Sequence, residues 1–142
     1  MKKTLILLIC TSLLTACDFI NLQSEIDCRN INTEIREKAE KELLPELKTI
    51  KTIDEYTLFI KSNYEYISKM DSEFRECMSS SAFTANKEEM NQWIQAGVHL
   101  NMLSISWGGF IEKPETNSVT DLDYYLQDTA HLLKNIFDEK EI

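Results

Sequence analysis

Apolar residues recur at steps of three and four along most of this chain, which is the spacing of one face of an α-helix. The clearest run covers residues 53–78 and follows Thr52-x-x-Glu55. That spacing is typical of a capping box, in which each side chain accepts a hydrogen bond from the other residue's backbone N–H. We predict a helix from about residue 53 to the serine run at 79–81. One position of its stripe is either Met70 or Asp71, and every other member is apolar, namely Ile53, Tyr56, Ile60, Tyr64, Ile67, Phe74 and Met78.

An earlier segment has a second stripe of the same kind, formed by Cys28, Ile31, Ile35, Ala39 and Leu43. Ser24 with Asp27 is a capping pair at its expected start. Pro45 leaves two alternatives open, because a proline either ends a helix or stands in the first turn of a new piece, where it is tolerated. The helix then stops at residue 44 or continues to about Ile50.

Two further helices are predicted downstream. One begins after Asn86, which forms a capping box with Glu89. This helix is apolar on nearly all sides between Val98 and Trp107, so we expect it to be the most buried helix of the fold. The other follows the capping pair in Ser118-x-x-Asp121, and its stripe is Leu122, Tyr125, Leu126, Leu133, Ile136 and Phe137.

The sequence Trp107-Gly108-Gly109-Phe110 is the one unusual connection between these helices. We expect the two glycines to end the third helix. In one interpretation Trp107 and Phe110 are exposed anchors for a protein partner, because aromatic residues dominate interface hot spots. In the other, which we prefer, the glycines form a C-cap and the aromatic rings close the end of the bundle.

The composition favours long elements, because the chain has only three glycines and two prolines and therefore few turns. Four amphipathic helices with short connections predict an all-α fold, a small antiparallel bundle of about four helices. We expect one domain over residues 24–142.

The first residues have a different pattern. Lys2 and Lys3 precede an apolar run from Leu5 to Leu14, and Leu14-Thr15-Ala16-Cys17 follows. A charged start, a short apolar segment and a small residue before the cleavage point predict a signal peptide over residues 1–16. The run is shorter than the roughly 20 residues that span a bilayer.

The four residues that end at Cys17 resemble the lipobox of bacterial lipoproteins. The resemblance implies a diacylglycerol on the Cys17 sulfur, cleavage before that residue and a lipidated tether over residues 17–23. It also implies that Asp18, directly after the lipidated cysteine, keeps the protein in the inner membrane rather than the outer one, facing the periplasm.

The cysteine count then favours a disulfide. Cys10 leaves with the signal peptide and Cys17 takes the lipid, so Cys28 and Cys77 remain as a pair in an oxidising compartment. If the first helix continues past Pro45, the two arms of an antiparallel hairpin match in length and this disulfide joins its open end. Two cysteines and two histidines without paired spacings do not predict a zinc site.

The chain is strongly acidic. Its formal charge of −9 becomes −11 without residues 1–16, which contain two lysines and no acidic residue. This charge argues against binding to nucleic acid or anionic lipid headgroups, and it favours a basic protein partner. The alternative is that negative charge only keeps the protein in solution.

No pattern of residues predicts an active site. The two histidines, His99 and His131, are more simply explained as a packed side chain and as an ion-pair partner of Asp128. Asp121-x-Asp123 fits helix capping better than a cation site, because the dense oxygen ligands of a calcium loop are missing. We therefore predict no catalytic residue, metal, cofactor or small-molecule substrate.

These observations predict a membrane-tethered periplasmic lipoprotein that binds and neutralises another protein, as immunity proteins and inhibitors do. The alternative is a structural, assembly or exclusion lipoprotein of an envelope secretion or conjugation apparatus. A hydrolase that uses a pair of carboxylates is a third class, but nothing singles out such a pair.

Overall fold

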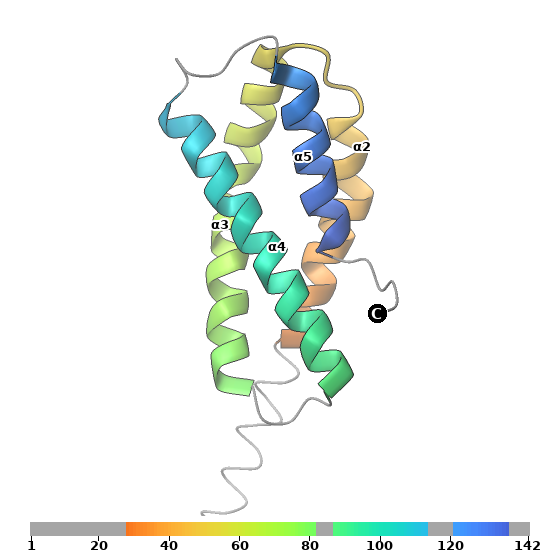
Figure 1. The fold of residues 1–142 in the computed structure, drawn as a ribbon, viewed down its shortest axis with the longest axis vertical. Coiled ribbons are helices and arrows are strands. Elements are labelled where there is room, and N and C mark those ends of the chain that lie inside the picture. The colour runs from red at the N-terminus through yellow and green to blue at the C-terminus, as the bar shows by residue number, and fades with distance from the viewer. Residues whose placement is uncertain (1–27, 82–86, 114–120, 137–142) are drawn as a thin grey trace, which may run out of the picture.

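The computed structural model describes residues 28–81, 87–113 and 121–136. In these residues the chain forms a four-helix, antiparallel bundle that runs up, down, up and down (Figure 1). The predicted all-α class is confirmed. The predictions for Cys17, Asp18, Ser24, Asp27, Asn86 and Ser118 lie outside the described residues.

The first helix passes through Pro45. Residues 28–38 are α-helical, the π-helical turn η1 (Ala39–Leu43) follows, and α2 (Leu44–Leu47) completes the rod. The backbone N–H of Leu44 donates to the carbonyl of Ala39, five residues back. Because a proline lacks an N–H and its ring crowds the carbonyl four residues earlier, the wider π turn accommodates Pro45 without ending the rod. This settles the alternative that the sequence left open.

The helix α3 (Ile53–Ser81) begins at the predicted capping box. The Thr52 N–H donates to Glu55 Oε2 at 3.1 Å, and the Glu55 N–H donates to Thr52 Oγ1 at 3.2 Å. The helix ends at the serine run, as predicted, and Ser81 is its last residue. The Ser79 hydroxyl donates to the carbonyl of Glu76 at 2.7 Å, so this serine bonds to the backbone of its own helix.

The helix α4 (Lys87–Glu112) does not end at Gly108 and Gly109 as predicted. Neither glycine has a positive φ, so neither adopts the left-handed conformation of a C-cap. A Cβ at Gly108 would lie 2.9 Å from the Tyr64 hydroxyl of α3. Gly108 thus allows α3 and α4 to approach closely.

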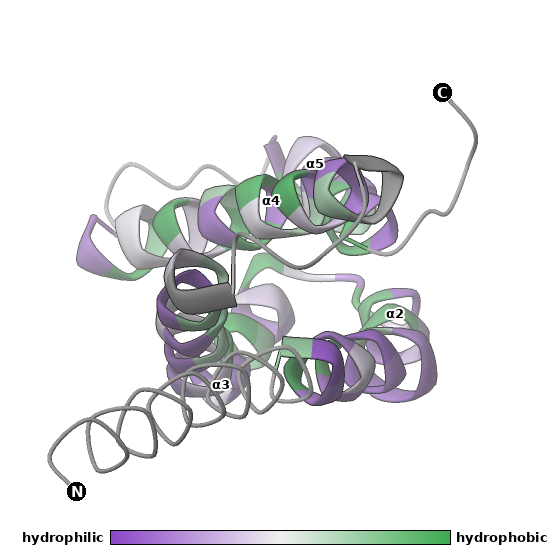
Figure 2. Ribbon diagram, turned by 90° about the horizontal axis from the view of Figure 1, so that it is seen from below, coloured by the Kyte–Doolittle hydropathy of each residue, from purple (hydrophilic) through white to green (hydrophobic). Residues whose placement is uncertain are grey.

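The helix α5 (Leu122–Asn135) packs beside α4, and Figure 2 shows these two helices as one layer and the first helix with α3 as the other. The prediction that α4 is the most buried helix is wrong. Trp93, Leu100 and Leu103 face the core, but the far side of α4 has no neighbour among the described residues and exposes apolar side chains. A helix in a two-layer bundle packs on one side only, whatever residues its other side carries.

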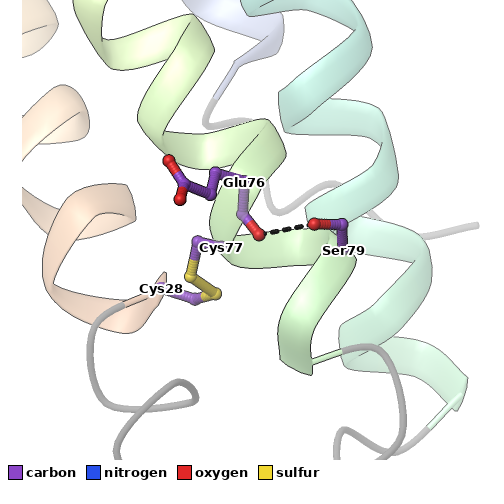
Figure 3. Close-up of a disulfide and its surroundings, with 4 residues drawn as sticks. All are labelled: Cys28, Glu76, Cys77 and Ser79. Atoms are coloured by element: carbon purple, nitrogen blue, oxygen red, sulfur yellow. Dashed lines mark hydrogen bonds between the residues drawn. A yellow bond between two sulfur atoms is a disulfide. The ribbon is translucent and has the colours of Figure 1, made fainter.

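The disulfide is formed as predicted between Cys28 and Cys77, with a Cα–Cα distance of 5.5 Å (Figure 3). It joins the start of the first helix to the last turns of α3. The arms of this hairpin therefore have matched lengths, as expected for a helix that continues through Pro45. The end of the bundle that contains the disulfide is called the stapled end below.

Candidate protein-binding surface

The Trp107–Phe110 segment lies inside the bundle. Trp107 is 0% exposed and Phe110 is 8% exposed. The interpretation that makes them exposed anchors is therefore wrong, and burial of both rings is confirmed. Both rings are buried because they lie on the side of α4 that faces α3 and α5, where they pack in an aromatic cluster.

Thr129 of α5 organises that cluster. Its hydroxyl lies 2.7 Å from the Tyr56 hydroxyl of α3 and accepts a bond of 3.3 Å from the Trp107 indole N–H of α4. The ring of Tyr56 stacks on Tyr125 at 5.8 Å and meets the edge of Phe110 at 5.1 Å. Burial raises the pKa of Tyr56 to about 12, although its hydrogen bond with Thr129 acts in the opposite direction. This cluster joins three helices and offers no exposed chemistry.

The two histidines lie together on neighbouring helices. The ring centroids of His99 and His131 are 6.5 Å apart and their planes are nearly perpendicular. His99 Nδ1 is 2.8 Å from the carbonyl of Gln95, and the His131 ring lies 3.0 Å from the amide nitrogen of Asn135. The predicted pairing of His131 with Asp128 is not formed in the described part of the chain. No pattern in the sequence indicates this proximity, because the two histidines are 32 residues apart.

No group of three or more potential metal ligands occurs within residues 28–81, 87–113 and 121–136. Asp121 is the N-cap residue of α5, although its side chain makes no capping hydrogen bond. Asp71 is buried between α3 and α4, where its Oδ2 meets Arg75 Nη2 at 2.9 Å and accepts a bond of 3.1 Å from the Asn101 amide. These acidic residues therefore serve the fold.

The end of the bundle opposite the disulfide is acidic, and we call it the distal end. It contains the turn after α2 and the adjacent ends of α3, α4 and α5 (Figure 1). Among the described residues, three exposed lysines lie there, namely Lys48, Lys51 and Lys113. Twice as many exposed carboxylates surround them, namely Glu46, Asp54, Glu55, Glu112, Asp121 and Asp123.

The first helix differs from the distal end because three of its outward carboxylates have cationic partners at four-residue spacing. Arg36 pairs with Glu40 at 3.3 Å, Lys41 pairs with Glu37 at 2.8 Å, and Lys38 pairs with Glu42. Such exposed pairs contribute little to stability, but they cancel the charge of this face. The distal end therefore has an excess of negative charge that the outward face of the first helix lacks.

A second surface feature is an apolar line on α4, formed by Ile94, Val98, Met102 and Ile105. We call it the α4 stripe. Much of the α4 stripe belongs to the segment from Val98 to Trp107, which is apolar on nearly all sides and which we predict to be buried. An apolar run that a two-layer bundle can cover on one side only is equally a signal of a docking surface.

No protein-family profile, curated protein or solved structure matches this chain. Among the helices that the structure describes, none combines the length and the apolar character that crossing a membrane requires.

Proposed function

We propose that this protein is a lipid-anchored, periplasm-facing lipoprotein that binds a basic protein through its distal end and neutralises it. It would act by binding rather than by catalysis. The anchor is Cys17, and Asp18 favours the inner membrane. The observation that carries the proposal is the excess of exposed carboxylates at the end of the bundle farthest from the anchor.

The position of the anchor supports this arrangement. Cys17 precedes Cys28 by eleven residues, and Cys28 belongs to the stapled end. Eleven residues span at most about 39 Å, so a lipid on Cys17 holds the stapled end within that distance of the membrane. The helix α3 has 29 residues and a length of about 44 Å, so a bundle that stands upright on its stapled end holds its distal end that far from the lipid headgroups.

The charge of the distal end supports a basic partner. Exposed carboxylates in excess of lysines attract a cationic surface and speed its association. They also disfavour an anionic membrane or a nucleic acid at this end. Asp54 and Asp123 stand in the first turns of α3 and α5, where acidic side chains also favour the helix, so their two roles are compatible.

The proposal is tested by capturing partners on the full-length protein in membranes from the source cells. We expect one stoichiometric basic partner, and we expect toxicity of that partner in the periplasm to be relieved by this protein. The variant Glu112→Gln/Asp121→Asn/Asp123→Asn should weaken capture at least tenfold at low salt. The matched control Glu37→Gln/Glu40→Gln/Glu42→Gln changes the net charge equally on the first helix and should capture normally.

Two outcomes would contradict the proposal. Equal losses in both variants would show that only the net charge matters. Capture of a large envelope complex, with no toxic component, would favour the assembly alternative. The anchor is tested separately, because Cys17→Ser should abolish incorporation of labelled fatty acid; persistent labelling would show that the anchor is misassigned.

A further inference from the structure

Tyr124 is an aromatic side chain that the fold leaves exposed at the distal end. It is the third residue of α5, whose first turn belongs to that end, and it is 66% exposed (Figure 1). Its ring lies 5.8 Å from the ring of Tyr125, with the two planes at 67°. Tyr125 in turn stacks on Tyr56 and meets the edge of Phe110 at 5.2 Å. Because Tyr124 is held against a ring that packs on the core, it loses little conformational freedom when a partner covers it.

Two carboxylates flank Tyr124 along α5. Asp121 precedes it by three residues and Asp128 follows it by four, and both spacings make side chains neighbours on a helix. The Asp121 side chain makes no capping hydrogen bond. Asp128 is half-buried, and its carboxylate has no hydrogen bond or ion pair within the described ranges. A half-buried carboxylate without a partner favours a cationic ligand, because nothing in the protein offsets its lost hydration.

The first helix and α3 show how this chain holds a cation between a ring and a carboxylate. Lys38 forms an ion pair with Glu42, and its Nζ lies 5.5 Å from the centroid of the Tyr66 ring. Tyr124 has a ring and carboxylates in a comparable arrangement, but among the described residues no cation of this chain lies over its ring. A cation at this ring would therefore come from another molecule.

The chemistry of these side chains selects arginine as that cation. A planar guanidinium stacks on an aromatic face, and its N–H groups remain available at the rim to donate to carboxylates. A lysine ammonium is a compact and strongly hydrated charge that fits this combination less well. We propose that Tyr124, with Asp121 and Asp128, receives an arginine side chain of the basic partner. This site rests on the proposed function, because it takes the distal end to be the surface that meets such a partner.

Labelled hexa-arginine and hexalysine peptides are the probes for this site. Their binding to the full-length protein in a neutral detergent is measured by fluorescence anisotropy at low salt. The parent should bind hexa-arginine about threefold more tightly than hexalysine, which is the factor that an exposed cation–π contact provides. Tyr124→Leu should remove this preference at unchanged net charge. Tyr124→Phe keeps an aromatic ring and should keep the preference.

Two matched controls separate the site from its surroundings. Leu58→Ala should keep the arginine preference, because Leu58 lies near the start of α3 at the same end and is 67% exposed. Asp128→Asn should weaken hexa-arginine binding more than Asp54→Asn, which removes the same charge from the first turn of α3. Circular dichroism should show the helix content of the parent in every variant, since none of these side chains belongs to the buried core.

The arginine site is wrong if the parent binds both peptides equally or binds neither of them. It is also wrong if the preference for hexa-arginine survives in Tyr124→Leu, because the preference would then arise elsewhere. Equal effects of Asp128→Asn and Asp54→Asn would show that Asp128 does not contact the guanidinium.

The proposed function fails in a different way. Glu46→Gln/Asp54→Asn/Glu112→Gln removes distal carboxylates outside the arginine site. If this variant binds both peptides more weakly while Tyr124→Leu binds them as the parent does, the acidic distal end keeps its role and only the arginine site is lost. If this variant binds both peptides as tightly as the parent does, the distal end is not a surface for basic partners.

Discussion

The Thr129 hydroxyl of α5 links three helices, because it forms hydrogen bonds with Tyr56 of α3 and with Trp107 of α4. Both partners are buried polar groups. A buried hydrogen-bond donor that loses its partner costs about 1–3 kcal/mol. Nothing in the sequence identified Thr129, because its two partners are far away along the chain. Tyr56 is 73 positions from Thr129 and Trp107 is 22 positions from it.

We expect Thr129→Val to lower the free energy of unfolding by about 3 kcal/mol, since it keeps the shape of the side chain and leaves the Tyr56 hydroxyl and the Trp107 N–H without their shared partner. Thr129→Ser keeps the oxygen and should recover most of the loss. Urea denaturation followed by circular dichroism measures both. Equal losses in the two variants would show that the methyl group matters as much as the hydroxyl, and a stability of Thr129→Val equal to that of the parent would contradict the role of the hydroxyl.

The pKa of Tyr56 predicts how stability depends on alkaline pH. Burial raises this pKa from 10.0 to about 12 in the folded protein. The unfolded chain therefore releases the phenol proton at a lower pH than the folded chain. The contribution to stability is complete below pH 10 and is lost as the pH rises toward 12.

Tyr56→Phe should flatten the decline of unfolding free energy between about pH 10 and pH 12. A smaller decline should remain, because burial and the nearby charge of Glu34 also raise the pKa of Tyr66. Urea unfolding at several alkaline pH values gives the slope. An unchanged slope in Tyr56→Phe would contradict the shifted pKa, and the absorbance of the phenolate offers an independent check.

At the scale of whole elements, periodicity located the helices, and one capping box located the start of α3. The Thr52 and Glu55 side chains form the expected capping box, and the stripe that contains Ile60 and Ile67 is buried. These features are local, so the sequence contains them. The errors arose where the outcome depends on a neighbouring helix, as at Gly108, or on how many neighbours a helix has, as along the outer face of α4.

The glycine pair of α4 allows a matched test. Gly109 has open space around it, so Gly109→Ala should raise the free energy of unfolding by about 1 kcal/mol through helix propensity. Gly108→Ala should gain less or lose stability, because the new Cβ would lie 2.9 Å from the Tyr64 hydroxyl. Thermal and urea unfolding distinguish the two variants.

A second substitution identifies the cause of that difference. Tyr64→Phe removes the hydroxyl that the Cβ at position 108 would meet. In the Tyr64→Phe background, Gly108→Ala should therefore approach the stabilisation of Gly109→Ala. If Gly108→Ala stabilises the parent protein as much as Gly109→Ala does, the close approach of α3 and α4 at this point is not a constraint.

For the whole molecule, the sequence predicted the bundle and its disulfide because few turn residues and two remaining cysteines restrict the arrangement strongly. The surfaces could not be predicted in the same way. The distal end collects carboxylates from four separate helix ends, and the pair of His99 and His131 joins two helices. Such groupings exist only after the chain has folded.

The disulfide should contribute about 4 kcal/mol to the free energy of unfolding, because it closes a loop across a sequence separation of 49 residues. We expect Cys28→Ala/Cys77→Ala to lose this amount. A similar loss should follow reduction of the parent protein, and urea unfolding with and without reductant compares them. A loss under about 1 kcal/mol would show that the unfolded chain is already compact without the cross-link.

The disulfide also governs how the molecule bears tension. A pull on the segment that leads into Cys28 passes through the sulfur atoms directly to the last turns of α3, so the first helix cannot be peeled away from its neighbour. The residues enclosed between Cys28 and Cys77 are removed from the length that can be drawn out, which amounts to roughly 170 Å of extended chain. In an oxidised molecule held by its amino-terminal segment, a load applied at the opposite end stretches only the part of the chain beyond Cys77.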